Sequence, residues 1–183
     1  MGELLTPAEK AELVPYVLET EQRGPQSIDA VGGPDGFGYY YVDNQNGDTT
    51  SYSWIELRGD NQATWLNFDN SDDGTININP SFDFPYYGVD YGTLNVCVNG
   101  FITFVDDRSS AFNQCLPASS LGGPAIAMFW DDLVLQDQQN GNSVVWRDFG
   151  SYIVIQFDEV AHYGFPTPPS DRYTFECILY ANG

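Results

Sequence analysis

The chain has 183 residues, which is enough for one sizeable hydrophobic core and short for two. Its 12 Tyr, 12 Phe and 4 Trp occur with 18 Gly and 11 Pro, a combination that favours many short strands joined by specified turns. The same composition argues against a helical bundle and against disorder. The composition therefore predicts an all-β protein.

Acidic side chains dominate the charge of the sequence. Six Lys and Arg oppose 26 Asp and Glu, which gives a formal net charge of −20. A surface this acidic repels phosphate backbones and anionic bilayers, so we expect neither nucleic-acid binding nor membrane-surface binding. Self-repulsion of this size is relieved by bound Ca²⁺ or by a saline or extracellular setting, and acidity can also serve solubility alone.

The first 24 residues differ in composition from the rest of the chain. Thr6-Pro7-Ala8-Glu9 has a capping hydroxyl, a proline at the first helical position and an acid three residues after the cap, while Pro15 must end or kink the helix. We expect a short helix and an extended linker over residues 1–24, acting as a spacer or a docking segment. A β domain then follows over residues 25–183. Since no apolar run is long enough to span a bilayer, membrane insertion is not expected.

The strongest strand pattern lies at residues 94–105. Apolar residues alternate with polar ones over residues 94–98, which is the period of a half-buried strand. Asn99-Gly100 then predicts a tight hairpin turn, because both residues tolerate positive φ, and residues 101–105 form the return strand. We expect the rest of the chain to pack around this hairpin.

Further short strands are separated by turn residues. We expect them at residues 39–42, 53–57, 64–68, 75–78, 124–135, 143–147, 151–160 and 173–180. This number of strands is typical of an antiparallel two-sheet β-sandwich. The long loop at residues 106–123 carries either a site or a minor strand.

The C-terminal residues Ala181-Asn182-Gly183 have the composition of a turn that follows a strongly patterned strand. A hairpin is expected to continue there. Two explanations are open: the sandwich lacks its last strand in this sequence, or another chain completes an open sheet edge.

The loop at residues 69–74 is a candidate cation site. It places oxygens of Asp69, Ser71 and Asp73 at alternate positions and ends in Gly74, as the first half of an EF-hand loop does. The twelfth position is Pro80, so the bidentate glutamate of an EF-hand is missing. The loop is either a Ca²⁺ site with further ligands from elsewhere in the chain or a solvated acidic turn.

A second candidate is the pair Asp131 and Asp132, which ends the apolar run 124–135. In a strand the two carboxylates point to opposite faces, so one is expected inside. The inward carboxylate can accept bonds from loop amides, pair with Arg147 or Arg172, or bind a cation.

The three cysteines cannot all pair within the chain. A disulfide between Cys97 and Cys115 would close an 18-residue separation in an oxidising compartment, leaving Cys177 as a buried thiol. Three reduced core cysteines are the alternative.

Catalytic motifs are not apparent in the sequence. His162 is the single histidine, and neither GxSxG nor HExxH occurs, which argues against a serine hydrolase and a zinc protease. We therefore expect a protein that is not an enzyme. Paired carboxylates for glycoside hydrolysis, and tryptophans as a sugar-stacking platform, keep a carbohydrate-binding or carbohydrate-active domain open as an alternative.

Three motifs carry a resemblance to a known family. In order they are DFPYYG at residues 83–88, VNGFITF at 98–104 and IAMFWDDL at 126–133. Over about residues 32–183 the chain resembles nidogen-like (NIDO) extracellular domains and the related β-sandwich modules of bacterial surface proteins and secreted peptidases. The resemblance implies a non-catalytic extracellular module that acts in adhesion, in surface attachment or as an accessory to another domain.

The leading hypothesis is therefore a secreted or cell-surface binding module of a larger, bacterial protein, stabilised by Ca²⁺. Its expected partners are a protein or glycan at a cell surface, or neighbouring domains of the same polypeptide. The alternative from another class is a structural subunit that assembles into oligomers or filaments by β-strand donation through an open edge.

Overall fold

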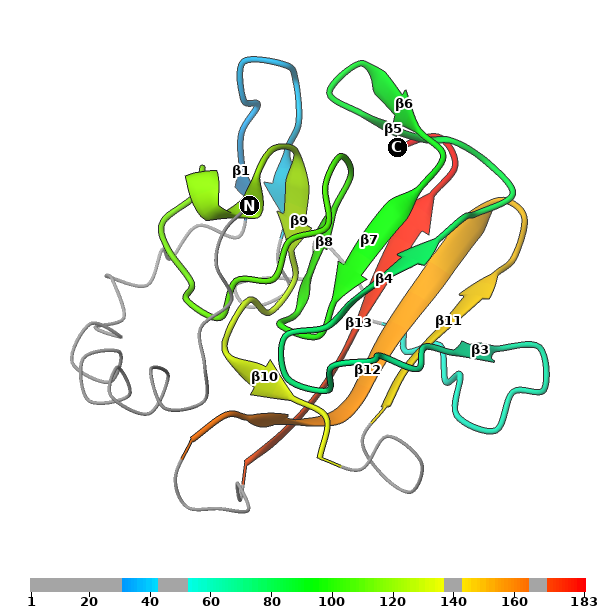
Figure 1. The fold of residues 1–183 in the computed structure, drawn as a ribbon. Helices are drawn as coiled ribbons and strands as arrows, with labels where there is room; N and C mark the ends of the chain where they lie inside the picture. The colour runs from blue at the N-terminus through cyan, green and yellow to red at the C-terminus, as the bar shows by residue number, and fades with distance from the viewer. Residues whose placement is uncertain (1–30, 43–52, 137–142, 165–170) are drawn as a thin grey trace. The chain divides into compact units, whose positions relative to one another are not determined.

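The computed structural model describes residues 31–42, 53–136, 143–164 and 171–183 (Figure 1). The chain divides into two compact units, one covering Pro15–Ile55 and the other containing Glu56–Gly183. The helix expected within residues 1–24 lies outside the described residues. The domain boundary at residue 25 stays a prediction.

In the smaller unit, β1 (Val31–Gly32) and β2 (Tyr41–Val42) form an antiparallel hairpin. The carboxylate of Asp35 fixes the connection, because its Oδ1 accepts the backbone N–H groups of residues 37–39 at 2.9, 2.8 and 2.9 Å. A side chain that satisfies its own following amides is the usual reason for Asp in a turn.

The larger unit is an antiparallel β-sandwich, which confirms the expected fold class. One sheet has the order β4 (Thr75–Ile78), β7 (Leu94–Cys97), β8 (Phe101–Thr103) and β9 (Ala125–Ala127). A two-stranded hairpin of β5 (Phe84–Tyr86) and β6 (Val89–Tyr91) is added between β4 and β7 in the chain.

The second sheet is organised around the long strand β12 (Tyr152–His162). One edge of β12 pairs with β13 (Arg172–Tyr180), and the other pairs with β11 (Ser143–Asp148) and β10 (Leu133–Val134). β3 (Thr64–Trp65) pairs with the far side of β11. In Figure 1 the second sheet lies against the first.

Alternating apolar side chains from both sheets form the main core. Leu94 and Val96 of β7 belong to the same buried cluster as Ile153, Ile155 and Phe157 of β12, and all five are fully buried. Burying a side chain of this size stabilises the fold by about 1.5–3 kcal/mol. The period-two pattern in the sequence therefore reports the inner face of each sheet.

The outer face of the first sheet is also buried, which differs from the half-buried strand expected at residues 94–98. Cys97 and Phe101 pack there with Leu121 and Trp130 in a second cluster. Loop 106–123, which carries a short 3₁₀-helix at Ser119–Leu121, contributes Leu121 to this cluster. The long loop thus covers a sheet face, and it contains no additional strand.

The outer face of β12 is covered by the segment that begins at Glu56. The amide of Gln156, which has no exposed surface, accepts the backbone N–H of Leu57 at 2.7 Å and donates to Glu56 Oε1 at 2.9 Å. Next to it, Arg58 Nη1 lies 2.6 Å from Asp158 Oδ2. The strand expected at residues 53–57 is wrong, since this segment bonds to a side-chain amide and joins no ladder.

Two further expectations need correction. The single strand expected at residues 124–135 is interrupted between β9 and β10, because the N–H groups of Met128 and Phe129 both donate to the carbonyl of Gly100 at 3.1 Å. The β7–β8 turn is also longer than two residues: Cys97 pairs with Phe101, and within the turn only Gly100 has positive φ, at 75°.

Asp158 makes stability depend on pH. Burial raises the pKa of its carboxyl, Arg58 opposes this, and Glu159 and Glu56 add to it. Because the folded state holds this proton more tightly than the unfolded state, Asp158 contributes its full stabilisation below the ordinary carboxyl pKa. That contribution to the free energy of unfolding is lost as the pH rises through the raised pKa. We expect the melting temperature of Asp158→Asn, relative to the parent, to improve between about pH 3.5 and pH 7.

Thermal unfolding of both proteins over this range measures the difference. The control is Asp90→Asn on β6, where the residue is exposed. A difference between Asp158→Asn and the parent that changes with pH no more than that of the control variant would contradict the assignment.

Gly100→Ala tests the close approach at the β7–β8 turn. An added Cβ would lie 2.1 Å from the carbonyl oxygen of Phe129 at a position with φ of 75°, so we expect a loss of about 3–5 kcal/mol in urea unfolding. Gly150→Ala is the matched control: it has φ of 83° and no atom within 4 Å of its Cβ position, and should lose about 1–2 kcal/mol. Equal losses of stability in the two variants would contradict the steric clash expected at Gly100.

Candidate metal centre

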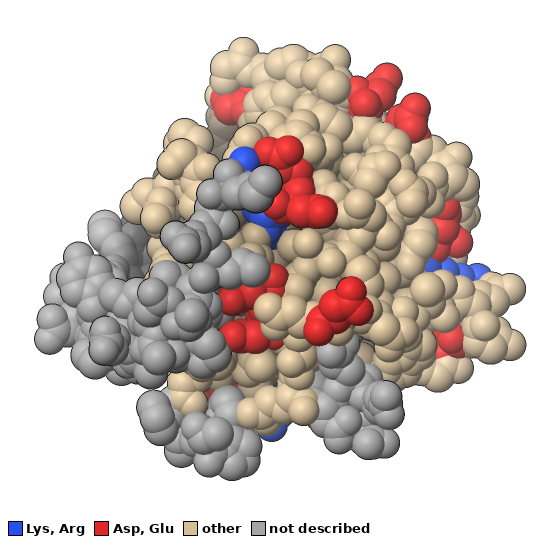
Figure 2. All heavy atoms as spheres, in the orientation of Figure 1, with Lys and Arg blue, Asp and Glu red and all other residues tan. Residues whose placement is uncertain are grey.

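Three carboxylates meet where the β3–β4 loop contacts the start of β10. Asp72, Asp73 and Asp132 each place one carboxylate oxygen within 4.8 Å of the others. Asp73 is 9% exposed and Asp132 is 8% exposed, so two of the three groups are shielded from solvent. Figure 2 shows that acidic side chains form several clusters on the visible face, whereas basic ones are few.

The β3–β4 loop is folded by Asn70. Its Oδ1 accepts the N–H of Asp72 at 3.0 Å and that of Asp73 at 3.3 Å, a side-chain turn that brings consecutive residues to one side. Gly74 closes the loop, because a Cβ there would lie 2.1 Å from the carbonyl oxygen of Asn70. The requirement for glycine is therefore close packing of two backbone segments.

Asn99 connects this loop to the segment before β10. Its Nδ2 donates to Asp73 Oδ1 at 3.0 Å, and its Oδ1 accepts the backbone N–H of Leu133 at 2.8 Å. Its backbone carbonyl accepts the N–H of Asp131 at 3.3 Å. Asn99 is completely buried, so these bonds are made away from competing water.

Asp131 takes a different role from its neighbour Asp132. Its Oδ1 accepts the backbone N–H of Asp132 at 2.9 Å and lies 3.5 Å from Nε2 of His162 on β12. The adjacent acids therefore separate: one carboxylate enters the group of three, and the other faces the single histidine.

The structure thus brings together two of the four carboxylates expected as ligands. Asp73 and Asp132 share the group, Asp72 is a member that the sequence analysis did not single out, and Asp69 and Asp131 are outside it. Ser71 anchors the loop through its backbone carbonyl, which accepts the N–H of Leu135 at 2.7 Å. Asp69 and Asp73 do not converge as the alternation in an EF-hand-like loop predicts, and in the turn at residues 71–73 the consecutive residues Asp72 and Asp73 come together instead.

The chemistry of this group is that of a site for a hard cation. Ca²⁺ is bound by carboxylate and carbonyl oxygens at about 2.3–2.6 Å, so two of its ligand atoms lie within about 5 Å of one another. Three carboxylates this close repel one another, and the repulsion is stronger in a shielded environment. A divalent cation relieves it.

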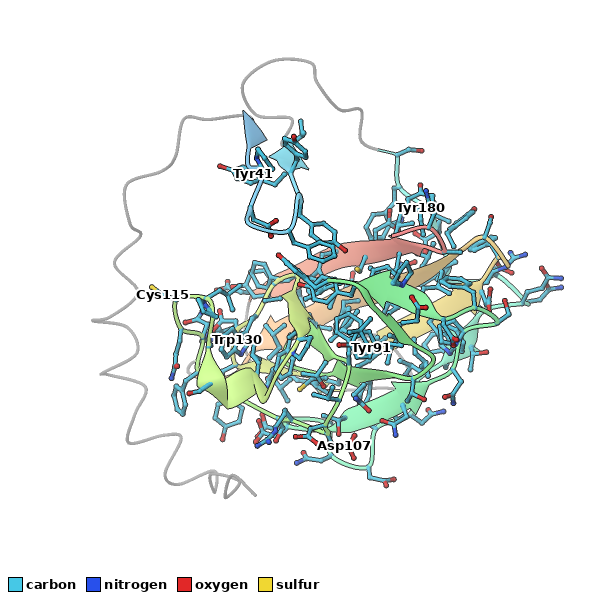
Figure 3. The ribbon with its side chains drawn as sticks, turned by 90° about the horizontal axis from the view of Figure 1, so that it is seen from above. Tyr41, Tyr91, Asp107, Cys115, Trp130 and Tyr180 are labelled. Carbon is cyan, nitrogen blue, oxygen red and sulfur yellow. The ribbon has the colours of Figure 1, made fainter. Side chains whose placement is uncertain are left out.

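None of the three cysteines forms a disulfide in this structure. Cys97 is buried in the cluster with Trp130, and Cys115 is exposed on loop 106–123 (Figure 3). Their disulfide is not formed here and stays a prediction. Burial raises the pKa of the Cys177 thiol to about 12, and the Glu176 carboxylate acts in the same direction, so this thiol is inert at neutral pH.

Comparison with known families identifies the sandwich. The family model described as NIDO related matches residues 45–182. The chain belongs to the NIDO-related family. The nidogen-like resemblance is thereby confirmed, and no solved structure matches the chain.

NIDO domains are generally extracellular modules of larger proteins. The match says nothing about the expected bacterial origin. In the described part of this NIDO-related chain, none of the helices has the length and apolar character that a bilayer crossing requires.

Asn99→Ala tests whether the buried amide holds this junction together. The change removes two buried hydrogen bonds, one to Asp73 Oδ1 and one from the Leu133 N–H, so we expect a loss of about 3–5 kcal/mol in the free energy of unfolding. Urea unfolding measures it. Asn77→Ala on β4, where the asparagine is exposed, is the matched control and should change stability by about 0.5 kcal/mol or less. Losses of similar size in the two variants would argue against the role of Asn99.

Proposed function

We propose that this NIDO-related chain is a non-catalytic binding module in the extracellular part of a larger protein, and that Ca²⁺ at Asp72, Asp73 and Asp132 stabilises it. Its partner is a protein or glycan at a cell surface, or a neighbouring domain of the same polypeptide. The observation that carries the proposal is the group of three carboxylate oxygens within 4.8 Å in a domain of an extracellular family.

Shielding of the carboxylates supports a cation at this place. Asp73 and Asp132 are less than one-tenth exposed, and shielding from solvent strengthens the attraction between a carboxylate and a cation. The hydrogen bond from the Asn99 amide is neutral, so it orients Asp73 without cancelling charge. A divalent cation would offset the mutual repulsion of the three carboxylates and would draw the β3–β4 loop and the start of β10 onto one centre.

A fixed loop junction is useful to a protein that acts by contact. Ordering a loop before its partner arrives removes part of the entropic cost of binding. Calcium in extracellular modules is bound with dissociation constants of about 10⁻⁴–10⁻³ M, which suits a site with few protein carboxylates. The proposed cation is therefore a structural component, and the binding surface lies on the elements that it holds.

Calcium titration tests the proposal. With free Ca²⁺ at about 100 times its dissociation constant, binding adds about 2.7 kcal/mol and should raise the melting temperature by about 5–10 °C. EDTA should reverse this shift. Asp73→Asn and Asp132→Asn each remove a ligand charge and should lose most of the calcium response, whereas Asp90→Asn on β6 should keep it in full.

A second readout addresses binding itself. Fluorescently labelled chain is incubated with cells in Ca²⁺ and in EDTA, and with the Asp132→Asn variant. Surface binding that needs Ca²⁺ and Asp132 supports the module. A melting temperature that is the same in Ca²⁺ and in EDTA would contradict the proposed calcium site. If surface binding is then also the same in Ca²⁺ and in EDTA, the domain recognises its partner without calcium.

A further inference from the structure

β13 is the last strand of the second sheet, and it pairs on one side with β12. Among the residues that the structure describes, no strand pairs with its other side. The strand runs for nine residues, Arg172–Tyr180, and Figure 3 shows it at the outer side of this sheet. A regular edge of this length presents a row of backbone groups that can pair with another strand.

The sandwich interior reaches solvent along this edge. Tyr173 and Phe175 pack against the main core, yet each is only partly buried. Phe129, which is 39% exposed, has its ring 4.9 Å from that of Tyr173 and 5.4 Å from that of Phe175. An added strand would cover this aromatic group.

We propose that a second copy of this chain pairs antiparallel with β13 across a twofold axis at Thr174. Residues at equal distances from Thr174 then face each other: Arg172 faces the partner's Glu176, and Tyr173 faces the partner's Phe175. Both relations occur twice by symmetry, as in an isologous interface. Opposite charges, aromatic pairs and Thr–Thr pairs are all favourable across antiparallel strands.

The position of the axis follows from charge complementarity. Arg172 and Glu176 are four residues apart, so they lie on one face of β13 and meet their counterparts only when Thr174 is central. An axis at Glu176 would place two carboxylates opposite each other, which is unfavourable. An axis at Phe175 would place Arg172 opposite the partner's Ile178.

Existing contacts hold the charged ends in place. Arg172 Nη2 donates to Gln136 Oε1 at 2.9 Å, and Nη1 donates to the carbonyl of Asp171 at 3.1 Å, so the guanidinium is oriented at the start of the strand. Glu176 lies opposite Gln156 on β12. Each copy carries a net charge of −20, which opposes association, and the paired stretch is short, so the dimer is weak and needs salt.

Sedimentation equilibrium over a range of protein concentrations tests this pairing. In moderate salt the mass of the parent should rise from 20.4 kDa towards about twice that value. Arg172→Glu gives two facing pairs of acids and Glu176→Arg two facing pairs of arginines, so each variant alone should associate at least about tenfold more weakly. An equimolar mixture of the two variants restores opposite charges and should form mixed dimers.

The double variant Arg172→Glu with Glu176→Arg should dimerise like the parent, and Asp107→Arg in the exposed part of loop 106–123 controls for the change in net charge. A defect in folding cannot produce recovery upon mixing. A parent that stays monomeric, a mixture no better than its components, or a mass that grows beyond the dimer would overturn the proposal.

Discussion

The buried amide of Asn99 is the constraint on which the arrangement of the loops depends. Its two ends are different, one a donor and one an acceptor, and both are used: the donor holds Asp73, and the acceptor holds the Leu133 backbone. The next residue, Gly100, accepts two further N–H groups from the segment after β9. The β7–β8 turn therefore sets the position of the β3–β4 loop and of the chain before β10, and so of the carboxylates.

Local pattern explains much of the sandwich and fails where a distant group competes for the backbone. Strands β4, β7, β11, β12 and β13 lie where alternation predicts them. After Pro124 the run at 124–135 has no glycine or proline to signal a break, and the interruption comes from the carbonyl of Gly100, about thirty residues earlier. Likewise, residues 53–57 have strand composition, yet the Gln156 amide captures the backbone of Leu57.

The candidate metal centre was only partly predictable for the same reason. Acidic residues at 69–74 and 131–132 mark both chain segments that form it, but the choice of side chains depends on Asn70, whose side-chain turn sends Asp72 and Asp73 inward together. Asn99 gives no sequence signal of its role, since Asn-Gly is fully explained by a turn. Its burial depends on tertiary packing, which the local sequence does not show.

Charge links the two proposals only weakly. One Ca²⁺ changes the net charge from −20 to −18 (−20 + 2), a small fraction of the total, so calcium alone does little to the repulsion between copies. Screening is the larger effect: at about 0.15 M ionic strength exposed charges farther apart than about 8 Å hardly interact. What remains at that salt is the local pairing at the edge, Arg172 with the partner's Glu176. The carboxylate site and the β13 edge therefore act through different forces, and either can fail without the other.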